Sequence, residues 1–107
     1  MKNLPKAPLV GQVCSYSWGY GQTNIEWFVV TEVLPKSIRI VAIEGIIDET
    51  GFMCGNTVPR LPVVHRESAV EELRRWKPSD YFGWAASMKY GCLTPWQGEA
   101  LYVSWYN

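Results

Sequence analysis

Hydrophobic and polar residues alternate along the first half of the chain with the period of two that is typical of β-strands. Val10–Trp18 places Val, Gln, Cys, Tyr and Trp on one face, and this pattern predicts a strand. Ile25–Leu34 is dense in β-branched and aromatic residues, and Ile38–Glu44 has the same character after a short polar break. The two runs predict a β-hairpin, which we take as the nucleus of the fold.

The strand predicted at 25–34 has apolar residues on both faces. Its odd positions suit a buried face: Ile25, Trp27, Val29, Thr31 and Val33. Its even positions carry Glu26 and Glu32, which favour solvent, but also Phe28 and Val30. Both faces are therefore expected to be partly covered.

The middle of the chain mixes glycines, prolines and charged residues. Gly45–Pro59 predicts a long excursion or an irregular hairpin, and Arg60–Arg66 a short edge strand, because Pro62 lacks an amide hydrogen. The sequence from Ser68 to Glu71 matches a helix capping box, which predicts a short helix over Ala69–Trp76. A strand edge is the alternative there, since about eight residues make a marginal helix.

The C-terminal part predicts a closing hairpin of Ser87–Leu93 with Ala100–Trp105. We expect a mostly β fold, on the border of α+β: a small antiparallel SH3-like barrel of about five strands with one short helix. An OB-like barrel and an open α+β sheet are the alternatives. Residues 1–8 are expected to be a flexible N-terminal arm and residues 9–107 a single compact domain.

Composition narrows the function classes. The 107 residues are 48% hydrophobic, and ten Lys+Arg balance ten Asp+Glu. A neutral chain argues against a protein whose main task is non-specific binding to a polyphosphate backbone. No apolar run approaches the length of a membrane span, and prolines at positions 5 and 8 interrupt the N-terminus, so a cytoplasmic protein without membrane contact is expected.

Cysteine and histidine spacing gives no support to a metal site or a cofactor. Cys14, Cys54 and Cys92 are far apart in the sequence, and His65 is the only histidine. We expect the cysteines to be small hydrophobes, although a cysteine paired in space with His65 is not excluded as a nucleophile. The scattered carboxylates do not form an acid–base pair by themselves. An enzyme is therefore the third hypothesis.

Two motifs carry a resemblance to a known family. The residues SWGYGQTN at 17–24 are followed by an acidic residue, two aromatics and a strand, and 96–106 fits the pattern WxGxxxYxxxY. The chain resembles, over roughly 10–46 and 87–107, a family of small uncharacterised proteins encoded by bacteriophages and bacterial mobile elements. The resemblance implies a compact, mostly β fold and a bacterial host cell, and it implies no activity.

Fifteen aromatic residues exceed what a minimal barrel core holds, so some are expected at the surface. Tyr, Trp, Gln and Asn combine rigid apolar area with hydrogen bonds, as binding surfaces do. Turn formation and coverage of a thin core explain the same residues without function. The candidate binding surface comprises Trp18, Tyr20, Gln22, Asn24, Trp96, Tyr102, Trp105 and Tyr106.

The leading hypothesis is a non-enzymatic phage or mobile-element accessory protein that binds a host or phage protein, with antagonism of a host defence complex as one version. The same aromatic surface would also serve a homo-oligomer. The runner-up is a nucleic-acid-binding barrel with weak, salt-sensitive contacts. Its candidate contacts are Arg60, Arg66, Arg74, Arg75 and Lys77, for which a solvated charged face is the simpler interpretation.

Overall fold

Strands alone build the part of the chain that the computed structural model describes, residues 6–19 and 22–105, where it contains nine strands and no helix. Six strands form a barrel: β1 (Val13–Trp18), β2 (Asn24–Val33), β3 (Ser37–Ile43), β6 (Glu72–Ser79), β7 (Gly83–Met88) and β8 (Gly91–Pro95). Three strands form a second sheet: β4 (Gly45–Gly51), β5 (Cys54–Pro59) and β9 (Leu101–Ser104).

The barrel is closed and antiparallel, with the strand order β1-β2-β3-β6-β7-β8 and pairing between β8 and β1. Each barrel strand therefore has a neighbour on both sides, which removes exposed edges from this part of the molecule. The expectation of a mostly β fold built on a small antiparallel barrel is confirmed, with six strands in place of about five.

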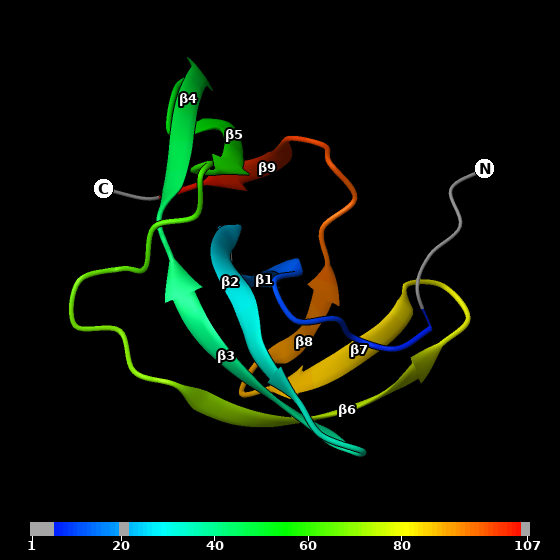
Figure 1. Ribbon diagram of the computed structural model, residues 1–107. Coiled ribbons are helices and arrows are strands. Elements are labelled where there is room, and N and C mark those ends of the chain that lie inside the picture. The colour runs from blue at the N-terminus through cyan, green and yellow to red at the C-terminus, as the bar shows by residue number, and fades with distance from the viewer. Residues whose placement is uncertain (1–5, 20–21, 106–107) are drawn as a thin grey trace.

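The second sheet has the order β4-β5-β9 and stands at one end of the barrel (Figure 1). The β4–β5 hairpin is inserted between the barrel strands β3 and β6, and it confirms the hairpin expected in 45–59. β9 returns from the C-terminal side to pair with β5. Two segments about 45 residues apart in sequence thus complete this sheet.

The long strand β2 serves both layers, as the apolar residues on its two faces indicate. Phe28 and Val30 point into the barrel core, whereas Trp27 and Val29 belong to a second buried cluster on the other side of the strand. Of the odd positions proposed as a core face, Ile25, Trp27 and Val29 therefore belong to this second cluster, whereas Val33, beyond a register shift, packs against the barrel core. A strand covered on both faces loses the simple apolar–polar alternation.

The barrel core is made of the residues that are most completely buried. It includes a tryptophan, Trp84, with no exposed surface. Its other members are Cys14, Tyr16, Phe28, Val30, Ile38, Ile40, Ala86 and Leu93. The second cluster is smaller: Trp27, Val29, Val41 and Ile43, with half-buried neighbours that include Trp96 and Leu101.

The helix expected over 69–76 is wrong. Residues 72–79 form β6, which pairs with β3 on one side and with β7 on the other. Glu72, Arg74 and Trp76 alternate with more exposed neighbours, which is a strand period. Ser68 has a φ of 62°, which differs from the extended backbone of an N-cap residue. Pairing on both sides outweighs a weak local helix signal.

Two further strand predictions are wrong. The closing hairpin does not form, because β8 pairs with β1 and β7 while β9 pairs with β5. The segment 60–66 is irregular apart from a single bridge between His65 and Ile43. Its amides at Arg60 and Arg66 donate to backbone carbonyls beside the end of β3. The N-terminal arm expected at 1–8 lies mostly outside the described residues, and within it Pro8 is buried.

Candidate binding cleft

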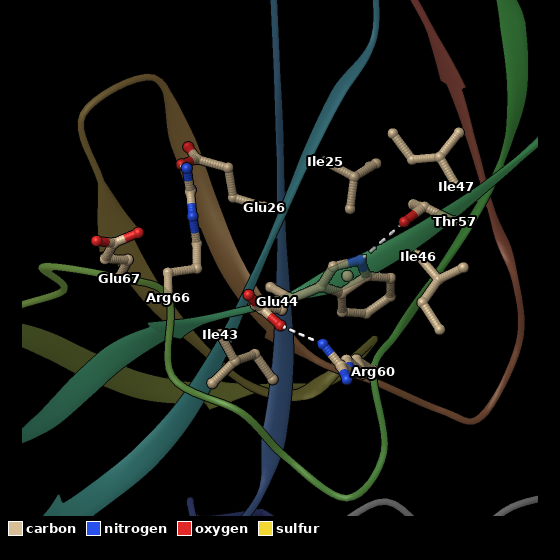
Figure 2. Close-up of a pocket in the computed structure, with 12 residues that line it drawn as sticks. Ile25, Glu26, Ile43, Glu44, Ile46, Ile47, Thr57, Arg60, Arg66 and Glu67 are labelled. Atoms are coloured by element: carbon tan, nitrogen blue, oxygen red, sulfur yellow. Dashed lines mark hydrogen bonds and ion pairs between the residues drawn. The ribbon is translucent and has the colours of Figure 1, made fainter.

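A cleft of about 740 Å³ lies where the β4–β5 hairpin leaves the barrel (Figure 2). Its walls come from the start of β2, the end of β3, the start of β4, Thr57 on β5 and the loop 60–67. Gly45 forms the junction: a Cβ atom there would lie 2.5 Å from Cδ1 of Trp27, so glycine lets the hairpin pass directly over the indole. The volume is within the range of ligand and peptide sites.

Apolar and polar side chains share the cleft wall. Trp27 is 3% exposed, and its Nε1 donates a 3.1 Å hydrogen bond to Oγ1 of the buried Thr57 on β5. This bond joins the second sheet to the barrel. Ile25 and Ile43 add apolar surface from the two barrel strands. The indole nitrogen at the base of the cleft is therefore paired within the protein.

Two arginines lie at the polar rim, and each is paired with a glutamate. Nη1 of Arg60 is 2.7 Å from Oε1 of Glu44, and Figure 2 marks this contact. Nη1 of Arg66 is 3.5 Å from Oε1 of Glu26. The four side chains are one-third to more than half exposed, so water screens both pairs. Glu67 lines the same rim and forms no ion pair with another of the described residues.

Strand β4 forms the outer wall of the cleft and is exposed over its whole length. Ile46 is 52% exposed and Ile47 is 57% exposed, values that are high for isoleucines in a regular strand. Figure 2 shows both isoleucines beside the cleft. Two adjacent exposed isoleucines beside a cleft with apolar residues at its base are typical of a site that another molecule covers.

Trp18, the first of the aromatic residues expected to bind, lies at an open end of the barrel. Its Nε1 donates a 2.8 Å hydrogen bond to Oε2 of Glu26, and its ring centroid is 6.2 Å from that of Tyr90. Nζ of Lys89 lies 5.2 Å from the centre of the Tyr90 ring. These groups line a small cavity of about 210 Å³ together with Arg74 and other side chains.

The loop that follows Trp18 contacts the second sheet. The amide of Thr23 donates to Oγ of Ser104, and the amide of Ser104 donates to the carbonyl of Thr23. Gln22 and Asn24 are partly buried beside this contact. Nδ2 of Asn24 is a buried donor without a hydrogen-bond partner. Tyr20 and Tyr106, which belong to the same predicted surface, lie outside the described residues.

The remaining aromatic candidates lie on the C-terminal segment. Trp96 packs edge-on against Trp27, with centroids 5.8 Å apart, and its Nε1 donates to the carbonyl of Glu99 at 2.6 Å. Trp105 is half-buried, and Tyr102 on β9 is 56% exposed. Trp18 and Trp96 therefore pack against different clusters and line different cavities.

The five basic residues named for a nucleic-acid contact are also separated. Arg60 and Arg66 line the cleft, while Arg74 lies at the open end of the barrel beside Trp18. Arg74 forms an ion pair with Glu72, and its Nε is a buried donor without a partner. Arg75 and Lys77 are exposed on the outer face of β6. Three of the five cations are thus already paired with glutamates.

The three thiols differ in their environment. Cys14 is buried in the barrel core, Cys54 is half-buried on β5 and Cys92 is exposed on β8. Burial away from water raises the pKa of the Cys14 thiol well above its usual range, so this group stays protonated. No group of three or more His, Cys, Asp or Glu side chains within 6–19 and 22–105 is arranged to hold a metal ion.

The sequence analysis did not identify Ile46, Ile47, Trp27 or Glu44 as parts of a site. The available signal was the Gly-Ile-Ile-Asp-Glu run at 45–49, in which two isoleucines interrupt a turn-rich segment. Within the part of the chain that the structure covers, no helix is long and apolar enough to cross a membrane. No family model, no curated protein and no solved structure matches this chain.

Proposed function

We propose that this chain is a non-enzymatic binding protein whose partner is another protein, and that the partner docks on the β4–β5 hairpin and the cleft beside it. The exposed pair of Ile46 and Ile47 on β4 carries the proposal, because both side chains are more than half exposed and both line the cleft. Burying the two side chains would contribute about 1.5–3 kcal/mol each if they were fully covered. A protein surface with apolar groups at its centre supplies such a cover.

The polar rim supports a protein partner rather than a reaction. Glu44 and Glu26 are each engaged by an arginine, and the hydroxyl of Thr57 is buried and accepts a hydrogen bond from Trp27. Paired, partly exposed charges around an apolar centre match the rim of a protein–protein interface. Tyr102, exposed on the far edge of the same sheet, extends the surface that a partner could cover.

The setting of the proposal follows from the motifs at 17–24 and 96–106. We propose that the chain acts in the cytoplasm of a bacterial host as an accessory protein of a phage or mobile element. A host defence complex is one candidate target. No structural observation favours nucleic acid, because Arg60, Arg66 and Arg74 are paired with glutamates.

The test is a comparative capture experiment from bacterial lysate with the wild-type chain and the double variant Ile46→Asp, Ile47→Asp. Both side chains are more than half exposed, so the variant is expected to fold. Two carboxylates at the centre of the docking surface are expected to remove the captured protein, because they would be buried without partners.

The matched control is Leu73→Asp, which changes an exposed apolar residue on the barrel strand β6. Wild type and control should capture the same protein in equal amounts. Equal capture by the hairpin variant, or the absence of a specific partner for the wild type, would overturn the proposal. A variant with Trp18→Ala tests whether the open end of the barrel contributes to the same interface.

A further inference from the structure

We propose that the partner presents an extended segment that joins the second sheet as a strand at the free edge of β4 and that carries both apolar and basic residues. This inference rests on the proposed function and specifies how the partner binds. Among the described residues β4 pairs with β5 alone, and the sheet order β4-β5-β9 leaves β4 at the edge. The outer backbone amides and carbonyls of an edge strand are available to another chain.

The edge of β4 has only some of the features that usually block such pairing. From Gly45 to Glu49 it pairs residue by residue with β5, and the only irregularity in that pairing comes near the turn, before Gly51. The strand contains no proline and no lysine, and all of its residues are exposed. Edge strands are commonly protected by a bulge, a proline or charged side chains. The charges of β4 are the carboxylates of Asp48 and Glu49, which oppose an acidic partner and leave the edge open to a basic one.

The other edge of the same sheet is protected. β9 has four residues, and the amide of its last residue, Ser104, donates to the carbonyl of Thr23 in the loop before β2. The next amide, that of Trp105, donates to the carbonyl of Met53 and continues the pairing of β9 with β5. The shortness of β9 and the contact of Ser104 with Thr23 make β4 the favoured edge for addition.

The register determines which residues of the added strand meet which surface. Ile47 lies opposite Thr57, whose hydroxyl accepts the hydrogen bond from Trp27, so this face of β4 is turned to the barrel. Side chains alternate between faces along a strand, so Ile47 and Glu49 share one face of β4, and Ile46 and Asp48 share the other. Each face of the edge therefore offers one isoleucine and one carboxylate to the added strand, which would cover the isoleucines with apolar side chains and pair basic side chains with the carboxylates.

The charge around this edge identifies the polar residues of the added strand. Asp48 and Glu49 lie on β4, and neither forms an ion pair with another residue in the part of the chain that the structure describes. With the three glutamates of the cleft they make five carboxylates against the two guanidinium groups of Arg60 and Arg66. Three negative charges in excess favour lysine or arginine in the partner.

A second copy of this chain fits the edge less well. Two β4 strands that overlap in full and run antiparallel would place Asp48 opposite Asp48, and like charges directly opposite destabilise a strand pair. The same charges that favour a basic segment thus oppose self-pairing. Self-association is retained as an outcome of the test.

The test is a selection of short random peptides displayed on a carrier, carried out in parallel on the wild-type chain and on the charge-reversed variant Asp48→Lys, Glu49→Lys. The wild type should enrich peptides that combine apolar with basic residues. The variant should enrich peptides that combine apolar with acidic residues. Failure to enrich any peptide, or the same sequences on both chains, would overturn the inference.

A second measurement distinguishes strand addition from simple charge attraction. The best peptide is made with N-methyl groups on alternate residues, in two versions that block either one backbone edge or the other. One version should lose roughly tenfold or more in affinity while the other keeps it, because only one edge faces β4. Equal loss in both versions, or in neither, contradicts strand addition.

The outcomes for the two proposals are separable. If the lysate partner requires Ile46 and Ile47 but no peptide is enriched, or N-methyl groups on either edge of the best peptide have the same effect, the protein-binding function stands and strand addition fails. If sedimentation shows a dimer of the wild type that Ile46→Asp, Ile47→Asp abolishes and no peptide competes with it, self-association replaces the proposed segment. If neither a partner nor a peptide is found, both proposals fail.

Discussion

The barrel and the second sheet use the same kind of strand in opposite ways. In the barrel, each strand has two neighbours, and the interior holds fully buried side chains such as Trp84, Ile38 and Leu93. In the second sheet, β4 has one neighbour and is exposed from end to end. We therefore expect the closed part to contribute most of the stability. The open part can then present its backbone and apolar side chains to a partner.

The two parts meet at one small cluster. Gly45 passes over the indole of Trp27, and that indole is hydrogen-bonded to Thr57. The orientation of the hairpin relative to the barrel therefore depends on a few contacts. Substitutions within the barrel, at the junction and at the rim are expected to lower the free energy of unfolding by decreasing amounts. They test whether the barrel contributes more to stability than the second sheet does.

The largest effect is expected in the barrel core. Trp84→Ala removes a side chain with no exposed surface and should lower the free energy of unfolding by about 3–5 kcal/mol. Urea unfolding followed by fluorescence measures the change. The matched variant in the second sheet, Ile46→Ala, should change stability by less than about 0.5 kcal/mol. Comparable losses in the two variants would contradict the division between the parts.

The junction is tested by Thr57→Val, which removes the acceptor for Nε1 of Trp27 and leaves a buried donor without a partner. The expected loss is about 1–3 kcal/mol. Amide hydrogen exchange should rise in β4 and β5 more than in the barrel. Thr50→Val, at an exposed position of β4, is the control and should leave exchange unchanged. An unaltered exchange pattern in Thr57→Val would show that other contacts hold the sheet.

The cysteines provide a probe in each part. Alkylation of the native protein should modify Cys92 first, then the half-buried Cys54 of the second sheet, and Cys14 of the barrel last. Because burial raises the pKa of Cys14, the folded state keeps its proton while the unfolded state loses it above the usual value of 9.0. This contribution to stability is complete below that pH and is lost as the pH rises, by about 1.4 kcal/mol per pH unit.

Cys14→Ala gives the control for the alkaline loss. The variant lacks the thiol, so its stability should decline less steeply above pH 9.0 than that of the wild type. Equal slopes, or alkylation of Cys14 as fast as of Cys54, would show that the barrel opens as readily as the second sheet. That result would remove the basis of the comparison between them.

The sequence predicted the barrel better than it predicted the cleft, for physical reasons. β2 and β3 have a strong period of two and a short turn, so local information identifies the hairpin. β6 was missed because Glu72 and Arg74 occupy inward positions at an open end of the barrel, where polar residues pair with each other. A strand with charges on its inner face lacks the expected apolar alternation.

The cleft depends on contacts between residues that are far apart in the sequence. Its junction needs Trp27 beside Thr57, and its rim needs Arg60 beside Glu44, and neither proximity follows from local pattern. The aromatic surface expected around Trp18 and Trp96 rested on the number of rings rather than on their positions. The positions of the C-terminal rings depend on the pairing of β9 with β5. The turn-forming residues at 94–99 had instead predicted that this strand pairs with the strand just before it.

The smallest effect is expected at the cleft rim. Arg60→Ala removes the ion pair with Glu44. The two side chains are 57% and 39% exposed, so the free energy of unfolding should fall by less than about 1 kcal/mol. The loss should shrink as salt rises, because water and ions already screen the pair. Arg75→Ala, at an exposed position of β6, is the control. A loss of several kcal/mol from Arg60→Ala would mean that the rim, and not the Trp27 junction, holds the second sheet in place. The cleft would then be a contact between the two parts of the fold rather than a surface available to a partner.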